Sequence, residues 1–117
     1  MKVLTIIGTR PEIIKMSRLI PVLDKLCTHI LLHTGQNYTN NLKDIFFKEL
    51  GVRQPDFSFD SKADSSFEEI GKILVGVEKT IKNVQPDKIV IYGDTNSGLS
   101  AIVAKKLGIP VFHLEAG

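Results

Sequence analysis

Charged side chains stand directly after apolar segments of the chain, and their types suit acid–base chemistry. Asp94 follows the apolar segment 88–92, and Glu115 follows the next one, 111–114. Two carboxylates that share a crevice can have their pKa values pushed apart, so that one serves as base and the other as acid. Asp94 is also a favourable helix N-cap, which is the structural alternative to a chemical role.

The segment Gly8-Thr9-Arg10-Pro11-Glu12 is suited to hold an anion. A helix that begins here offers free backbone N–H groups and a partial positive charge. Arg10 adds a planar fork that matches phosphate oxygens, and Lys15, one turn further on, supplies a second cation. The alternative is a surface pair of Arg10 with Glu12 beside a solvated Lys15.

Other sites are disfavoured by their patterns. The chain has no Gly-x-Gly-x-x-Gly fingerprint, no Gly-x-Ser-x-Gly elbow and no Walker A sequence. His29 and His33 are four apart without a third ligand nearby, so we expect no metal site. His113 and Glu115 are two apart and share one face of an extended strand, although a lone histidine there is more often structural.

The elements that must position these residues alternate along the chain. Short apolar segments predict strands over 3–7, 30–33, 57–59, 88–92 and 111–114. Helical spacing predicts helices over 9–26, 40–50, 66–83 and 99–107. For the first helix we expect a capping box of Thr9 and Glu12 and a kink at Pro21. This order predicts an α/β fold, a Rossmann-like doubly wound parallel sheet with helices on both faces.

Ligands of such sheets bind outside the carboxyl ends of the strands. Four polar junctions therefore open onto one edge: 8–12, 34–38, 93–97 and 113–117. If strands 88–92 and 111–114 are neighbours, about 4.8 Å apart, Asp94 and Glu115 reach the same crevice.

Length and composition bound the class of protein. The 117 residues suffice for one domain, and 43% are hydrophobic and 24% charged. A net charge of +2 gives no argument for nucleic acid or an anionic membrane as partner. Cys27 is the single cysteine, which favours a reducing cytoplasm. The sequence has no apolar run of membrane-spanning length and no signal-peptide pattern, so we expect a cytoplasmic protein.

Three of the motifs in this order resemble the non-hydrolysing UDP-N-acetylglucosamine 2-epimerases: Gly8-Thr9-Arg10-Pro11-Glu12, Gly93-Asp94-Thr95 and His113-Leu114-Glu115-Ala116-Gly117. The similarity covers the whole chain and includes Lys15 and the Gly35-Gln36 turn. The resemblance implies two Rossmann-like domains of GT-B type facing a cleft. Residues 1–117 then form an incomplete N-terminal domain, and the C-terminal UDP-binding domain is absent from this chain.

The resemblance also implies a reaction. The proton at C2 of UDP-N-acetylglucosamine is removed as UDP leaves C1, and the glycal is reprotonated on its other face before UDP returns. Asp94 and Glu115 carry over as acid/base or sugar-orienting carboxylates, and Arg10 and Lys15 as substrate-contacting cations. His113 and Gln36 are further substrate-binding candidates, and no cofactor is implied. A homodimer is an expectation that comes from the family alone.

Two features depart from the family pattern: the turn after Gln36 and the end of the chain, since family members continue past the motif that ends in Gly117. Asn37 and Tyr38 follow Gln36, where many bacterial members have a histidine, so a regulatory substrate site is in question. Gly35-Gln36-Asn37-Tyr38 together with Asp94-Thr95-Asn96-Ser97 more closely resembles a capsule or O-antigen branch of the family, whose members epimerise related UDP-2-acetamido sugars. A glycosyltransferase of the same architecture and a non-catalytic nucleotide-sugar-binding module remain alternatives. The 117 residues alone are expected to be inactive.

Overall fold

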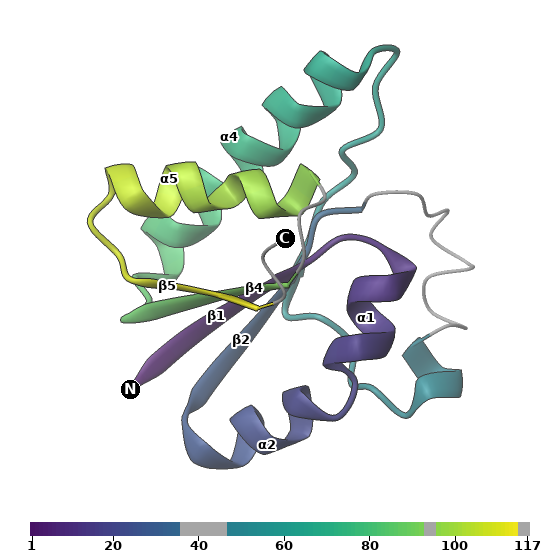
Figure 1. Ribbon diagram of the computed structural model, residues 1–117, viewed down its shortest axis with the longest axis vertical. Helices are drawn as coiled ribbons and strands as arrows, with labels where there is room; N and C mark the ends of the chain where they lie inside the picture. The colour runs from purple at the N-terminus through teal and green to yellow at the C-terminus, as the bar shows by residue number, and fades with distance from the viewer. Residues whose placement is uncertain (36–46, 93–95, 115–117) are drawn as a thin grey trace.

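A computed structural model describes residues 1–35, 47–92 and 96–114; for Arg10, Asn96 and Ser97 it describes the backbone alone. Strands and helices alternate along the described chain, and Figure 1 shows the sheet between two layers of helices. Helices α1 (Arg10–Met16) and α2 (Leu19–Leu26) cover one face, and α4 (Ser66–Val84) and α5 (Ser100–Lys106) cover the other. The predicted α/β class is confirmed, and so is the prediction that helices cover both faces of the sheet.

The sheet has five parallel strands in the order β3-β2-β1-β4-β5. Their bounds are β1 Lys2–Ile7, β2 Thr28–His33, β3 Phe57–Ser58, β4 Lys88–Tyr92 and β5 Val111–Leu114. The chain adds strands on one side of β1 and then crosses over to add β4 and β5 on the other. This reversal is the doubly wound order, and it confirms the Rossmann-like prediction.

Alternating side chains of the strands pack into two separate hydrophobic cores, one on each face of the sheet. On the α1/α2 face the core contains Val3, Ile7, Leu31, Val90, Ile13, Met16, Ile20, Phe47 and Val52. On the α4/α5 face it contains Leu4, Ile6, Leu32, Ile89, Ile91, Ile73, Val77, Ile81 and Ala104. Because both faces of the central strands are buried, those strands show continuous apolar runs in the sequence.

The expected single helix over 9–26 is wrong, because the structure divides it into α1 and α2. The break lies at Ser17 and Arg18, upstream of the predicted kink at Pro21. Ser17 ends α1, and both its backbone N–H and its hydroxyl donate to the Ile14 carbonyl oxygen. Pro21 thereby falls in the first turn of α2, where its missing N–H needs no partner.

The other described helices agree with their patterns. Helix α4 begins after Ser65, whose hydroxyl accepts a hydrogen bond from the Glu68 N–H at 3.2 Å, and it ends at Gln85 in the left-handed conformation. A short 3-10 segment, Asn96–Leu99, precedes α5. Residues 47–50 are helical, and the rest of the helix predicted over 40–50 lies outside the described residues. None of the described helices is both long and apolar enough to cross a bilayer.

Candidate active site

The carboxyl ends of the strands form the edge at which the sequence places the chemistry. Strands β4 and β5 are parallel neighbours, with Tyr92 beside Leu114 at their last paired position. The condition under which Asp94 and Glu115 were predicted to share a crevice, that these two strands are neighbours, is therefore met. The side chains of Asp94 and Glu115, which follow them, lie outside the described residues, as does Gln36.

Glu12 joins the end of β1 to the first turn of α1. Its side chain is buried, with 2% of the residue exposed, and its carboxylate accepts hydrogen bonds from the Gly8 N–H and the Thr9 hydroxyl, both at 3.1 Å. Thr9 is the N-cap as predicted, but its side chain makes no bond to the helix backbone. The reciprocal capping box is wrong, because the Thr9 hydroxyl donates to Glu12 instead of accepting from the helix.

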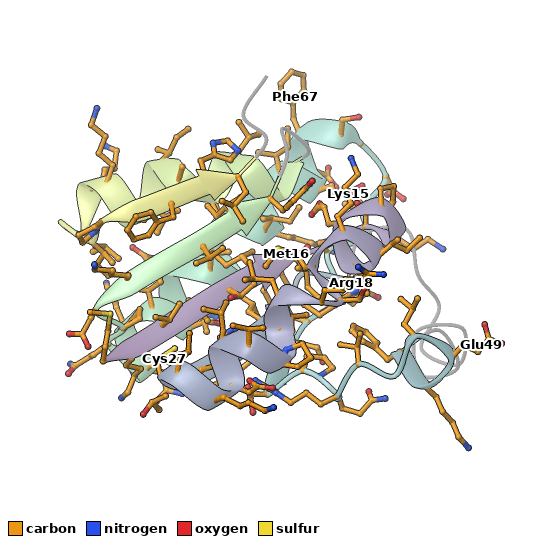
Figure 2. All side chains as sticks on the ribbon, turned by 60° about the horizontal axis from the view of Figure 1, so that its bottom comes forward. Lys15, Met16, Arg18, Cys27, Glu49 and Phe67 are labelled. Carbon is orange, nitrogen blue, oxygen red and sulfur yellow. The ribbon has the colours of Figure 1, made fainter. Side chains whose placement is uncertain are left out.

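The two predicted cations both lie on α1. Arg10 is its first residue, and its side chain lies outside the described part of the structure. Lys15 is exposed in the last turn and projects beside the strand ends (Figure 2). Its Nζ lies 5.4 Å from the centroid of the Tyr92 ring. Lys15 is thus not simply solvated, since a cation over an aromatic face is attracted by the ring.

His113 lies on the other face of the sheet. It pairs with Ile91, which belongs to the α4/α5 core, whereas Tyr92 packs against the α1/α2 core. Paired residues of neighbouring strands point to the same face. The structure therefore separates His113 from Lys15, although both side chains are exposed.

The end of β2 adds buried polar groups that the sequence motifs do not single out. The His33 ring is fully buried, accepts a hydrogen bond at Nδ1 from the Gly35 N–H at 2.9 Å, and meets the Phe47 ring edge-on at 5.7 Å. Gly35 has a φ of +79°, and a Cβ there would overlap the Phe59 carbonyl oxygen. This glycine is needed for the turn to pass β3 closely.

Sequence reasoning missed Tyr92 and His33 as residues of this edge. The one available signal is positional, because each is the last residue of its strand. Two further buried hydroxyls, Ser61 and Ser100, make no hydrogen bond within the described part of the chain. Among all the residues that the structure describes, no three side chains of metal-ligating type come together.

A second polar cluster, which we call the strand-start cluster, lies near the beginning of β2 and consists of Thr5, Asp24, His29, Arg53 and Asp56. His29 bonds Thr5 Oγ1 through Nε2 at 2.6 Å and Asp24 through Nδ1 at 2.7 Å. Arg53 donates to Asp24 at 3.0 Å and to Asp56 at 2.9 Å. Every charged member is bonded within the cluster.

The protonation of this cluster follows from its bonds. Burial by itself raises the pKa of Asp24, but hydrogen bonds from Arg53 and His29 outweigh burial and hold that pKa below its ordinary value. Burial likewise opposes the charge of Arg53, while its bonds to Asp24 and Asp56 raise its pKa. The cluster is thus stable with Asp24 and Arg53 charged.

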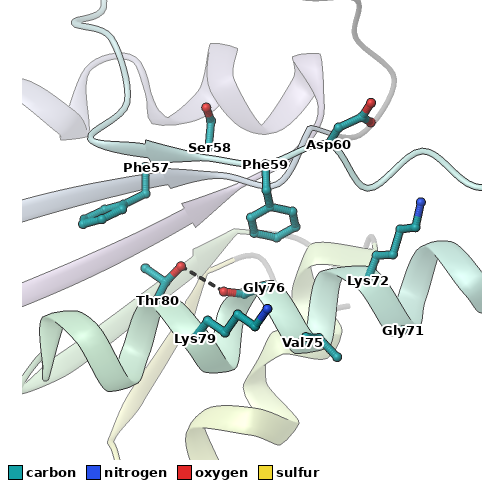
Figure 3. A pocket seen from close by; sticks show the side chains of 10 residues that line it. All are labelled: Phe57, Ser58, Phe59, Asp60, Gly71, Lys72, Val75, Gly76, Lys79 and Thr80. Carbon is teal, nitrogen blue, oxygen red and sulfur yellow. Dashed lines mark hydrogen bonds between the residues drawn. The ribbon is translucent and has the colours of Figure 1, made fainter.

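Two hollows of the described surface lie away from the site. One, of about 540 Å³, lies between β3 and α4, where the rings of Phe57 and Phe59 face the helix (Figure 3). The Phe59 ring covers Gly76, at which a Cβ would lie 2.5 Å from the ring carbons. A second, mostly apolar, lies over β4 and β5 beside α2. Neither contains Lys15 or the buried groups around Glu12.

Comparison with known proteins agrees with this arrangement. The family model of UDP-N-acetylglucosamine 2-epimerase matches residues 23–117. The UDP-N-acetylglucosamine 2-epimerase of Methanococcus maripaludis is 43% identical over 99% of this chain and 32% of its own length. The UDP-2,3-diacetamido-2,3-dideoxy-D-glucuronate 2-epimerase of Pseudomonas aeruginosa is 39% identical over 100% of this chain and 34% of its own.

The fold is shared with solved structures. The UDP-GlcNAc 2-epimerase of Methanocaldococcus jannaschii, solved in complex with UDP-GlcNAc and UDP, superimposes with a TM-score of 0.91 at 43% identity. It is matched over 100% of this chain and 33% of that one, so the chain spans about a third of the length of these relatives. The family model covers most of the residues of the chain, and the strand order and the motifs at the strand ends agree with it. The chain therefore belongs to the UDP-N-acetylglucosamine 2-epimerase family.

Proposed function

We propose that this chain supplies one wall of the active site of a UDP-N-acetylglucosamine 2-epimerase, which interconverts UDP-N-acetylglucosamine and UDP-N-acetylmannosamine. The observation that carries the proposal is that β4 and β5, which Asp94 and Glu115 follow in the sequence, are parallel neighbours, with Lys15 on α1 over the ring of Tyr92 at the end of β4. A carboxylate pair next to a cation fits a reaction that moves a proton and releases a diphosphate.

The roles proposed for these residues are those that the family's motifs imply for the matching positions of this chain. One of Asp94 and Glu115 removes the C2 proton while the C1–O bond to UDP breaks, which leaves a glycal and free UDP. Protonation of C2 on the opposite face and re-addition of UDP at C1 complete the inversion. Arg10 and Lys15 balance the charge of the departing diphosphate, and Gln36 and His113 contact the substrate. His113 lies on the opposite face of the sheet from Tyr92 and Lys15, so it would contact another part of the substrate.

The proposed site needs a second wall. Residues 1–117 serve as the Rossmann-like N-terminal domain, and a UDP-binding domain outside these residues faces the edge across a cleft, as in a GT-B architecture. The relatives, about three times as long as this chain, support this arrangement. We expect the 117 residues alone to show no epimerase activity.

The reaction is tested by incubating the intact protein with UDP-N-acetylglucosamine in D₂O and following the sugar by NMR. UDP-N-acetylmannosamine with deuterium at C2 is the expected product, because the proton that returns comes from solvent. Transfer of the sugar to an acceptor without inversion would instead identify a glycosyltransferase. No conversion at all would favour a non-catalytic binding module.

The site is tested with isosteric variants of the two carboxylates. Asp94→Asn and Glu115→Gln should each lower kcat/KM by on the order of 10²-fold or more. Glu78→Gln on the exposed side of α4 is the matched control and should leave kcat/KM unchanged. Parent rates in both site variants would show that the carboxylates are assigned to the wrong residues.

A second substrate is favoured by one relative. The Pseudomonas aeruginosa protein acts, by its name, on a UDP-2,3-diacetamido sugar acid and is nearly as similar as the Methanococcus maripaludis protein. The same residues would invert C2 of such a UDP-2-acetamido sugar by the same steps. Measuring kcat/KM for both sugars with one preparation decides which is preferred.

A further inference from the structure

Tyr92 connects the end of β4 to the cation on α1. It is the last residue of the strand and packs, partly buried, against the α1/α2 core. Its neighbour across the ladder is Leu114 of β5. Packing against the core and against a cross-strand neighbour restricts where the ring can lie. The ring is therefore a fixed platform at the mouth of the proposed site.

Lys15 lies over this platform at 5.4 Å from the ring centroid. A lysine ammonium is a compact charge on a flexible four-carbon stem, and an exposed one samples many positions unless something attracts it. The face of an aromatic ring attracts a cation within about 6 Å of its centroid. The Tyr92 ring thus biases the exposed Lys15 toward the carboxyl ends of β4 and β5, after which Asp94 and Glu115 follow in the sequence.

We propose that Tyr92 is a positioning residue for Lys15: its ring holds the ammonium where the diphosphate of a UDP-sugar binds and leaves. This inference rests on the proposed function. Tyr92 itself contacts neither the sugar nor the diphosphate in this account, and acts through Lys15. The aromatic ring carries the proposed effect.

A second lysine over a ring provides an internal control. Lys88 Nζ lies 5.1 Å from the centroid of Phe112, on the same face of the sheet. Lys88 begins β4, so this pair lies at the opposite end of the strand from Tyr92. The two pairs have the same chemistry and differ in their distance from the proposed site.

The experiment measures kcat, KM and the Kd of UDP for the intact protein and its variants. Tyr92→Leu should raise KM and the Kd of UDP and lower kcat/KM by about two- to five-fold, the factor that an exposed cation–π contact is worth. Tyr92→Phe should restore the parent values, and Phe112→Leu should leave them unchanged. In a Lys15→Met background Tyr92→Leu should have no further effect, because the group it positions is gone.

A spectroscopic measurement tests the placement without relying on catalysis. The ring current of Tyr92 should shift the ε-methylene NMR signal of Lys15 upfield, and the shift should persist in Tyr92→Phe and vanish in Tyr92→Leu. A loss as large in Tyr92→Phe as in Tyr92→Leu, or an equal loss in the Lys15→Met background, would overturn the inference. If the parent binds UDP without epimerising, the proposed function fails, and the UDP titrations and ring-current shift still decide the role of Tyr92.

Discussion

The two polar regions on the α1/α2 face differ in how their charges are used. In the strand-start cluster, Asp24, His29 and Arg53 bond one another, and Arg53 also reaches Asp56 and the His29 carbonyl oxygen. At the carboxyl edge, Glu12 is buried and bonded to the chain, while Lys15 remains exposed over a ring. The charged groups of the strand-start cluster are bonded to one another, whereas the ammonium of Lys15 at the carboxyl edge is exposed over a ring.

This difference separates residues that hold the fold from residues that are available to a ligand. Charges that are bonded to each other and partly buried stabilise the positions of α2, β2 and the segment before β3. At the carboxyl edge, by contrast, the ammonium of an exposed lysine is attracted to an aromatic ring instead of being enclosed in a cluster of charges. Changes to the two regions should accordingly affect different measurements, from activity at the edge to stability at the strand starts.

The largest effect is expected at the edge. Lys15→Met should lower kcat/KM of the intact protein by on the order of 10²-fold, because it removes a cation that balances charge on the departing diphosphate. Its free energy of unfolding, measured by urea denaturation, should change by no more than about 1 kcal/mol. Lys25→Met on the exposed side of α2 is the control. Strong destabilisation with parent activity per folded molecule would place Lys15 among the structural charges.

The next effect is expected inside the strand-start cluster. Thr5→Val keeps the shape of a fully buried side chain but leaves His29 Nε2 without its partner, which should lower the free energy of unfolding by about 2 kcal/mol. Thr80→Val removes a hydroxyl that bonds a carbonyl oxygen within α4 and should cost less than about 0.5 kcal/mol. Equal losses in the two variants would contradict a special role for the Thr5–His29 bond.

A smaller effect is expected for Arg53→Met. This change removes the bonds to Asp24 and Asp56, but the Arg53 side chain is 32% exposed, so water replaces part of what is lost. We expect a loss of about 1 kcal/mol in urea denaturation and unchanged kcat for the intact protein. A fall in kcat without a loss of stability would show that the two regions are coupled.

The smallest effect is a pH dependence. The pKa of Asp24 is lower in the folded chain than its ordinary value of 3.8, so the stability it contributes is complete above that value and is lost as the pH falls through the folded pKa. The difference in free energy of unfolding between the parent and Asp24→Asn should therefore be constant above about pH 5 and shrink as the pH falls below 3.8. A difference that stays constant down to about pH 3 would mean that Asp24 has the same pKa in both states.

Much of the fold could be predicted, because turn residues and apolar segments in the sequence indicate the same helices and strands that the buried side chains require. Strand 88–92 lies between Pro86 and Gly93, and its bounds are those of β4. The break between α1 and α2 was not predicted, since apolar residues at helical spacing continue across it. There the Ser17 hydroxyl, and the tolerance of Pro21 in a first turn, decide where one helix ends and the next begins.

For the candidate site, too, some features could be predicted from the sequence and others could not. Arg10, Lys15, Asp94 and Glu115 are found from residue type and from their place after apolar segments. The contact of Lys15 with Tyr92 has no sequence pattern, because the two residues are 77 positions apart and meet only through the crossover that sets β4 beside β1. The separation of His113 from Lys15 likewise depends on which face each strand residue takes.

The amino-acid sequence by itself determined the alternation of strands and helices, the parallel sheet and the positions of charged residues at the strand ends. These features follow from local propensity and from the burial of short apolar segments on both faces. Tertiary structure alone decided which strands are neighbours, which face each side chain occupies and which polar groups are closed off. Those outcomes depend on contacts between residues far apart in the chain, and such contacts exist only once the sheet has formed.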